Sequence, residues 1–157
     1  MSKVKNLVLL NNIELEDTEA NTQAAEDRAI VDTYFSKKLN LTTIYKTGVG
    51  ETGTACKVKV WGYVGSKSES TEFPYSSSTN KQIANDEENW VQIGTYEIGT
   101  GTATFTPVEL DCGGGAADTT YKKHFLKDIT FSKIRVSAFE SGTPTNKGIL
   151  KVIASIQ

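Results

Sequence analysis

The sequence contains few of the residues on which enzymes and metal sites usually depend. Among 157 residues there are one histidine, two cysteines and one methionine. The motifs of a G-x-S-x-G nucleophile, an H-E-x-x-H zinc site and a phosphate-binding loop do not occur. The histidine, His124, stands among lysines near a strand end, a setting more typical of a surface residue than of a catalytic base. We therefore predict a protein without catalytic residues, cofactor or metal.

Cysteine is equally scarce, and neither cysteine has the surroundings of a metal ligand. Cys56 and Cys112 lack a C-x-x-C spacing and a nearby histidine, which argues against zinc. Cys56 lies in an apolar alternation and is expected to be a small buried residue. Cys112 precedes Gly113–Gly115, a flexible stretch in which a thiol can be exposed. Whether the two cysteines form a disulfide stays open at this point.

The sequence also has no large excess of charge of one sign and no long apolar run. The formal net charge is −2 at pH 7, whereas nucleic-acid binding favours a basic face. No apolar run approaches the ~18 residues of a membrane-spanning helix. The opening run, Val4–Leu10, is too short for the hydrophobic region of a signal peptide with its cleavage site. We therefore expect neither nucleic acid nor a membrane as a partner.

What the sequence does contain indicates β structure. There are 3 prolines and 13 glycines, and short alternating segments rich in Thr and aromatic residues lie between Gly- and Ser-rich turn clusters. The gaps between these segments show no helical pattern of the length that parallel βαβ units require. The expected fold is a single all-β domain, an antiparallel β-sandwich or jelly roll of about eight strands. The predicted strands are Arg28–Phe35, Leu39–Tyr45, Ala55–Val64, Trp90–Ile98, Thr102–Leu110, Tyr121–Phe125, Ile129–Phe139 and Ile149–Ile156.

Several of these strands are apolar on one face and partly apolar on the other. The face that should form the core contains Val58, Val60, Ile134, Val136, Val152 and Ala154. The opposite face of Ala55–Val64 carries Trp61 and Tyr63 beside two lysines. Arg135 and Phe139 lie on the corresponding face of Ile129–Phe139, and Ile149 and Ile153 flank Lys151 on the last strand.

Three explanations of these mixed faces stay open. Loops or the N-terminal segment can cover the second face. The exposed aromatic residues and Arg135 can belong to a protein–protein interface, where such residues are enriched. Finally, Trp61, Tyr63 or Trp90 can provide a stacking surface for a sugar.

The N-terminal residues 1–27 differ from the rest and are expected to lie at the periphery of the fold. The acidic stretch after Leu10 has no consistent apolar face, so a helix there would bury very little. We predict an extended attachment arm that adds a strand to a neighbouring subunit through Val4, Leu7 and Leu9. The competing interpretation is that Lys3–Leu10 pairs within its own sandwich as an edge strand. Residues 28–157 would then form the β-sandwich domain.

Two stretches resemble a known class of proteins. These are W-V-Q-I-G-T-Y-E-I-G-T-G-T-A-T-F-T-P-V-E-L at Trp90–Leu110 and D-I-T-F-S-K-I-R-V-S-A-F-E-S-G-T-P-T-N-K-G-I-L-K-V at Asp128–Val152. They resemble the jelly-roll virion proteins of tailed bacteriophages, of the head decoration or auxiliary capsid kind. The shared features are a W-x-x-I-G strand, a K-I-R-V-S-A strand and a closing T-N-x-G-x-L-x-V hairpin. The resemblance covers about Arg28 to Gln157.

The resemblance implies a binding and stabilising role in the virion without catalysis. Such proteins bind the major capsid protein or another virion protein, and they often form homo-oligomers, commonly trimers. The chain would then be assembled into particles in the host cytoplasm. The same layout is loosely similar to discoidin-type sugar-binding sandwiches, so a carbohydrate-binding module, for example for host attachment, is the alternative function.

Overall fold

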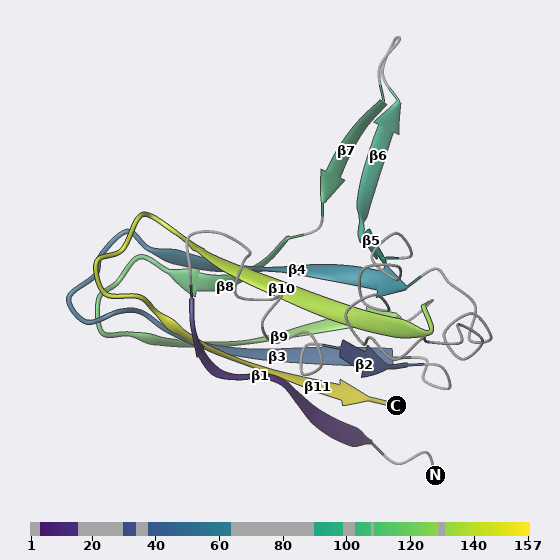
Figure 1. Ribbon diagram of the computed structural model, residues 1–157, viewed down its shortest axis with the longest axis horizontal. Coiled ribbons are helices and arrows are strands. Elements are labelled where there is room, and N and C mark those ends of the chain that lie inside the picture. Colours follow the sequence, from purple (N-terminus) through teal and green to yellow (C-terminus); the bar gives the residue numbers. More distant parts are fainter. Residues whose placement is uncertain are drawn as a thin grey trace, which may run out of the picture.

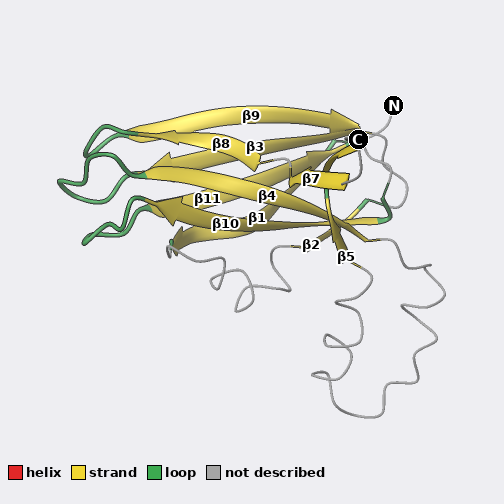
Figure 2. Ribbon diagram, turned by 90° about the horizontal axis from the view of Figure 1, so that it is seen from above, coloured by secondary structure: helices red, strands yellow, loops and turns green. Residues whose placement is uncertain are grey.

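The computed structural model describes residues 4–15, 30–33, 38–63, 90–98, 103–107, 109–128 and 131–157, and all regular structure in these ranges is β-strand. Figure 2 accordingly contains strands and loops but no helix in the described part of the chain. The same ranges therefore hold no helix that could cross a membrane. The strands are β1 (Lys5–Glu14), β2 (Ile30–Asp32), β3 (Lys38–Lys46), β4 (Ala55–Tyr63), β5 (Trp90–Gln92), β6 (Gly94–Ile98), β7 (Ala103–Pro107), β8 (Glu109–Gly114), β9 (Thr120–Asp128), β10 (Lys133–Ser141) and β11 (Ile149–Ile156).

Apart from β6 and β7, the strands form two antiparallel sheets that pack face to face (Figure 1), which confirms the predicted all-β sandwich. The four-stranded sheet has the order β1-β11-β3-β9, and the five-stranded sheet has the order β2-β10-β4-β5, with β8 also paired to β4. The first strand pairs with the last, and the pairing continues inward: β1 with β11, β2 with β10, β3 with β9, and β4 with β8. Within the described ranges, strands from the first part of the chain thus pair with strands from the last part in nested order.

The core lies between the inner faces of the two sheets. Along β4, β10 and β11, buried residues alternate with more exposed ones, as a strand with one buried face requires. All of the predicted core residues have 4% or less of their surface exposed: Val58, Val60, Ile134, Val136, Val152 and Ala154. The core assignment for these strands is confirmed.

The N-terminal strand corrects the prediction of a peripheral segment. β1 pairs with β11 from Lys5↔Ile156 to Glu14↔Ile149, so it is an edge strand of its own sandwich. Leu10 and Leu15 are fully buried in the common core. The proposed boundary at residue 27 is therefore wrong for residues 5–15, while residues 16–27 lie outside the described part.

Bulges explain why the sequence pattern of β1 was misleading. The register between β1 and β11 shifts between Val8 and Leu10 and again between Leu10 and Ile13. Asn12, in the second irregular stretch, has a φ of 51°, in the left-handed region. These shifts allow the successive residues Leu9 and Leu10 both to be buried. A simple alternation would have placed one of them outside.

The middle of the chain departs from the prediction in a second way. The predicted strand Trp90–Ile98 divides at Ile93, whose backbone N–H donates to Val60 O over 2.9 Å, into β5 and β6. The predicted strand Thr102–Leu110 likewise divides into β7 and β8. The strands β6 and β7 pair with each other as a separate two-stranded sheet. In Figure 1 this hairpin stands away from the sandwich on the side of β4.

Candidate functional site

The outer face of the five-stranded sheet brings together most of the residues that the sequence singled out. β4 contributes Trp61 and Tyr63, and β10 contributes Arg135 and Phe139. The two strands are direct neighbours, with Arg135 opposite Trp61 in the register. We call this surface, with the lysines between these residues, the basic–aromatic face.

Cations and aromatic rings pair across the basic–aromatic face. The guanidinium of Arg135 lies 5.2 Å from the centroid of the Trp61 ring. Lys133 Nζ lies 4.8 Å from the Tyr63 ring centroid, and Lys59 Nζ lies 5.2 Å from that of Phe139. Such cation–π contacts contribute about 0.5–1 kcal/mol each at exposed sites. The arrangement explains why aromatic residues alternate with basic ones on an outward face.

These pairings reduce the surface that the rings offer to a ligand. Trp61 Nε1–H donates to Ser137 Oγ over 2.9 Å, while Arg135 lies over the indole ring. Tyr63 is buried, with 2% of its surface exposed. Trp90 pairs with Tyr63 in the backbone register of β5, and its side chain lies outside the described part. Trp61 and Tyr63 are therefore primarily part of the chain's own packing.

The predicted attachment residues of the N-terminus are divided between core and surface. Leu9 is 1% exposed, and Leu7 packs against the core from a half-buried position. Val4, just before β1, is 57% exposed. Leu7 and Leu9 are therefore part of the chain's own sandwich, which corrects their assignment to an arm that binds another subunit.

The outer face of the four-stranded sheet carries apolar side chains, most of which the sequence analysis did not identify. Val8, Leu126 and Ile149 are 48%, 67% and 42% exposed. Val8 lies opposite the half-buried Ile153 in the register, and Ile44 on β3 lies opposite Lys151. These five apolar residues come from all four strands of the sheet.

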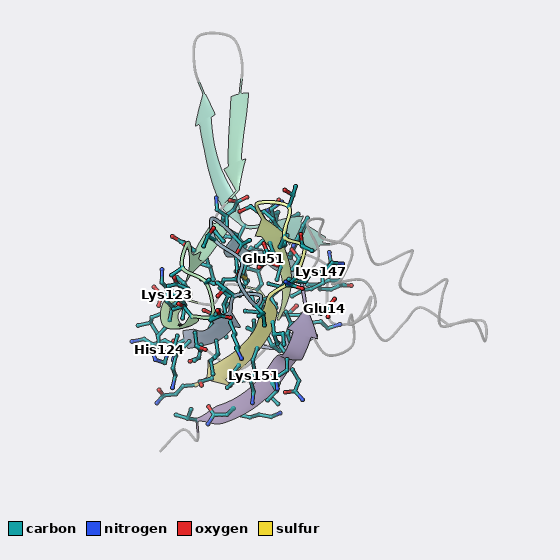
Figure 3. All side chains as sticks on the ribbon, turned by 90° about the vertical axis from the view of Figure 1, so that its left-hand side faces the viewer. Glu14, Glu51, Lys123, His124, Lys147 and Lys151 are labelled. Atoms are coloured by element: carbon teal, nitrogen blue, oxygen red, sulfur yellow. The ribbon has the colours of Figure 1, made fainter. Side chains whose placement is uncertain are left out.

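Lysines lie beside two of these apolar residues. Ile149 is paired with Lys46 on one side and with Glu14 on the other, and Ile44 is paired with Lys151 on one side and Lys122 on the other. Figure 3 shows Lys151 and His124 on the side of the molecule opposite the β6–β7 hairpin. His124 Nδ1 lies 2.9 Å from Thr42 Oγ1, so the histidine is hydrogen-bonded on the same surface. We call this surface the lysine-flanked face.

The alternation of residues in the sequence could predict part of this face. The alternation of the last strand places Ile149 and Ile153 outside, as predicted, and the structure confirms that Ile149 is exposed. Ile44 could have been found in the same way, because it lies between residues whose side chains face the core. Val8 could not, since the bulges of β1 obscure which of its residues face outward.

A buried carboxyl group lies near the loop end of the sandwich, where β10 approaches its connection to β11. Glu140 is fully buried, and its Oε2 accepts the backbone N–H of Gly148 over 2.8 Å while Oε1 accepts the hydroxyl of Tyr45. Tyr45 OH is also 3.3 Å from Thr54 Oγ1. Burial, and then the bond to Glu140, raise the pKa of Tyr45 well above its ordinary value. A Cβ on Gly148 would lie 2.6 Å from Glu140 Oε1, so close packing requires glycine there.

The buried network joins β3, β10 and the turn before β11, and its groups do not reach solvent. Its chemistry is that of a structural hydrogen-bond network. Within the described ranges, no group of three or more His, Cys, Asp and Glu residues could hold a metal ion.

No family model, curated protein or solved structure matches the chain.

Proposed function

We propose that this chain is a non-enzymatic structural protein of a tailed-bacteriophage virion that binds the capsid lattice and stabilises it. The observation that carries the proposal is the lysine-flanked face. An antiparallel sheet with one solvated face normally presents polar side chains outward. Here Val8, Leu126 and Ile149 are all exposed on one side of one sheet. Apolar residues gathered within a polar rim are typical of surfaces that bind another protein.

The lysines indicate the chemistry of that partner. The apolar residues have three lysines beside them, Lys46, Lys122 and Lys151. A partner surface with apolar and acidic groups would complement the apolar residues and the lysines alike. These three lysines outnumber Glu14, the acidic residue paired with Ile149, so a second copy that docked through the same face would bring mostly like charges together, which repulsion disfavours. We therefore expect this face to bind a different surface, which we assign to the major capsid protein or another virion protein. A homo-oligomer, as a trimer, would have to form through other surfaces.

The nested strand pairing supports a jelly-roll topology. A jelly roll consists of two Greek keys, in which strands distant in sequence lie side by side in two packed sheets. The pairs β1·β11, β2·β10, β3·β9 and β4·β8 have this relation. Jelly rolls are common in viral capsid proteins and in lectins. The topology is therefore compatible with the virion proposal and with the carbohydrate alternative, and the character of the two outer faces favours the first.

Carbohydrate binding receives less support from the described residues. A sugar-binding platform needs an accessible aromatic ring, whereas Arg135 lies over Trp61 and Tyr63 is almost completely buried. The lysine-flanked face, by contrast, contains aliphatic residues and lysines, which suit a protein surface better than a sugar ring.

Binding to particles tests the proposal. Purified protein should sediment with phage particles that lack it, and Ile149→Asp should weaken this binding at least tenfold because a carboxylate replaces an apolar contact. Val49→Asp is the matched control, since Val49 is 70% exposed in a turn outside this face. Failure of the unaltered protein to bind particles, combined with specific binding in a glycan array, would favour the carbohydrate alternative instead.

A further inference from the structure

The two cysteines, 56 residues apart in sequence, lie side by side in the core. Cys56 on β4 is paired with Gly113, and the next residue, Lys57, is paired with Asp111, so Cys112 is the extra residue of a bulge in β8. Both cysteines are free and completely buried. The expectation that Cys56 is buried is confirmed, whereas the expectation that Cys112 can be exposed is wrong.

Strand pairing makes the two cysteines near neighbours, because Cys112 is next to Gly113, the residue directly opposite Cys56. Residues directly opposite each other on antiparallel strands have Cα atoms about 4.5–5.5 Å apart. Cysteines joined by a disulfide have Cα atoms about 4.4–6.8 Å apart. Because both side chains point into the core from adjacent positions of β4 and β8, the backbone needs no large movement to join them.

The surroundings make the two thiols chemically different. The contact between the two thiols raises the pKa of Cys56, and burial raises it further, whereas the same contact lowers the pKa of Cys112 against the opposing effect of burial. The Thr43 hydroxyl also lowers the pKa of Cys112, and Thr43 Oγ1 is buried without a conventional hydrogen-bond partner. Cys112 is therefore the more reactive thiol, because the thiolate is the nucleophile.

A hollow lies next to the cysteines, although neither cysteine lines it. It has a volume of about 470 Å³ and is lined by residues adjacent to both cysteines, among them Ala55, Asp111 and Gly113. Glycines form much of its wall, and a Cβ on Gly113 would collide with the ring of Tyr121. At its rim Lys123 Nζ lies 3.9 Å from Asp111 Oδ1. The hollow therefore adjoins the bulge that contains Cys112.

We propose that Cys56 and Cys112 are an oxidation site at which a peroxide forms an intrachain disulfide between β4 and β8. The Cys112 thiolate attacks one oxygen of hydrogen peroxide, the O–O bond breaks, and the released hydroxide takes up a proton to leave as water. Cys112 is then a sulfenic acid. The sulfur of Cys56 attacks the sulfur of Cys112, the S–O bond breaks, and the oxygen leaves as a second water with the proton of Cys56. Two thiols and one peroxide thus give one disulfide and two waters.

The disulfide would connect β4 to β8 across the long segment between them. A covalent link of this kind restricts the unfolded chain, so it stabilises the fold against unfolding. The inference is independent of the proposed function, because it rests on the cysteine pair alone.

The experiment exposes the folded full-length protein to hydrogen peroxide and then measures free thiols in denaturant. We expect both thiols to disappear, the mass to fall by two hydrogen atoms, and peptide mapping to identify a Cys56–Cys112 link. The midpoint of thermal unfolding should rise after oxidation and return to its original value with a reducing agent. Cys56→Ser and Cys112→Ser are matched controls that should form no intrachain link and show no rise.

Three results would overturn the inference. The native protein could retain both thiols under conditions that oxidise the chain in guanidinium, which would show that the fold separates or shields the pair. Oxidation could instead produce disulfide-linked dimers. It could also stop at sulfinic acid on one cysteine, without a link to the other.

Discussion

Glu140 is a carboxyl group that is fully buried in the interior of the sandwich. Its acceptors are used by Gly148 N–H and by the Tyr45 hydroxyl, so its burial is compensated by hydrogen bonds. Removing it would leave the Gly148 N–H without this partner and the Tyr45 hydroxyl with only its longer contact to Thr54 Oγ1, and a buried group without a partner costs about 1–3 kcal/mol. We expect Glu140→Ala to lower the free energy of unfolding by about 2–5 kcal/mol in a denaturant titration. Glu140→Gln keeps an acceptor and should cost less. Equal stability of the alanine variant and the unaltered protein would contradict this role.

Tyr45 should make the stability of the fold depend on alkaline pH. Burial raises the pKa of Tyr45 from its ordinary value of 10.0, so the folded protein retains a proton that the unfolded chain loses above that pH. Its contribution to stability is therefore complete below pH 10 and decreases as the pH rises further. Tyr45→Phe should have a shallower loss of stability above pH 10 than the unaltered protein, measured by denaturant titrations at several pH values. Identical pH dependences of the variant and the unaltered protein would show that the ionisation of Tyr45 is not coupled to unfolding.

At the scale of elements, β1 is part of the folding unit. It covers one edge of the four-stranded sheet and buries Leu9 and Leu10. Loss of a buried leucine side chain costs about 2–5 kcal/mol. Deletion of residues 2–12 should therefore lower the midpoint of thermal unfolding of the isolated protein strongly. Deletion of residues 2–4, which precede β1, is the control and should change it little. A truncated protein with an unchanged midpoint would restore the attachment-arm interpretation.

The β6–β7 hairpin should be the least stable of the described elements. Its two strands pair with each other in a sheet separate from the sandwich. An isolated two-stranded hairpin is marginally stable in water. Hydrogen exchange should therefore be faster for the amides of Thr95–Ile98 than for those of β3, which is paired on both sides. Equal protection of the two strands would show that the hairpin is held by contacts beyond its own pairing.

The strands themselves show which parts of the fold the sequence determines locally. β4 and β10 could be predicted because each has regular alternation and one buried face, as at Val58 and Val136. β1 could not be assigned to the core because two bulges interrupt its alternation. The site was predictable only in part: alternation indicates that Trp61 and Arg135 face outward. Their direct pairing depends on which strands become neighbours, which is a property of long-range register.

At the scale of the whole molecule, the net charge of −2 conceals an uneven surface. Lysines occur on the outer faces of both sheets, but their surroundings differ. On the basic–aromatic face, Lys59 and Lys133 lie over rings of the same chain, and Lys57 Nζ is 3.1 Å from Glu109 Oε2. On the lysine-flanked face, Lys151 lies between two isoleucines of its own strand and opposite a third. The basic side chains of the first face are thus engaged with the chain's own rings and carboxylate, whereas the second face is the one that we propose binds a partner.

This difference leads to a prediction about salt and charge. If the lysine-flanked face binds an acidic surface, Lys151→Glu should weaken sedimentation with particles at least tenfold, because attraction becomes repulsion at the centre of the contact. Lys57→Glu is the matched control: it makes the same change of charge on a central strand of the other sheet and should leave binding nearly unchanged. Raising the salt concentration should weaken binding of the unaltered protein, since salt screens charges at solvent-accessible surfaces. Equal effects of the two substitutions would show that the net charge of the molecule controls binding, and that the lysine-flanked face is not the docking surface.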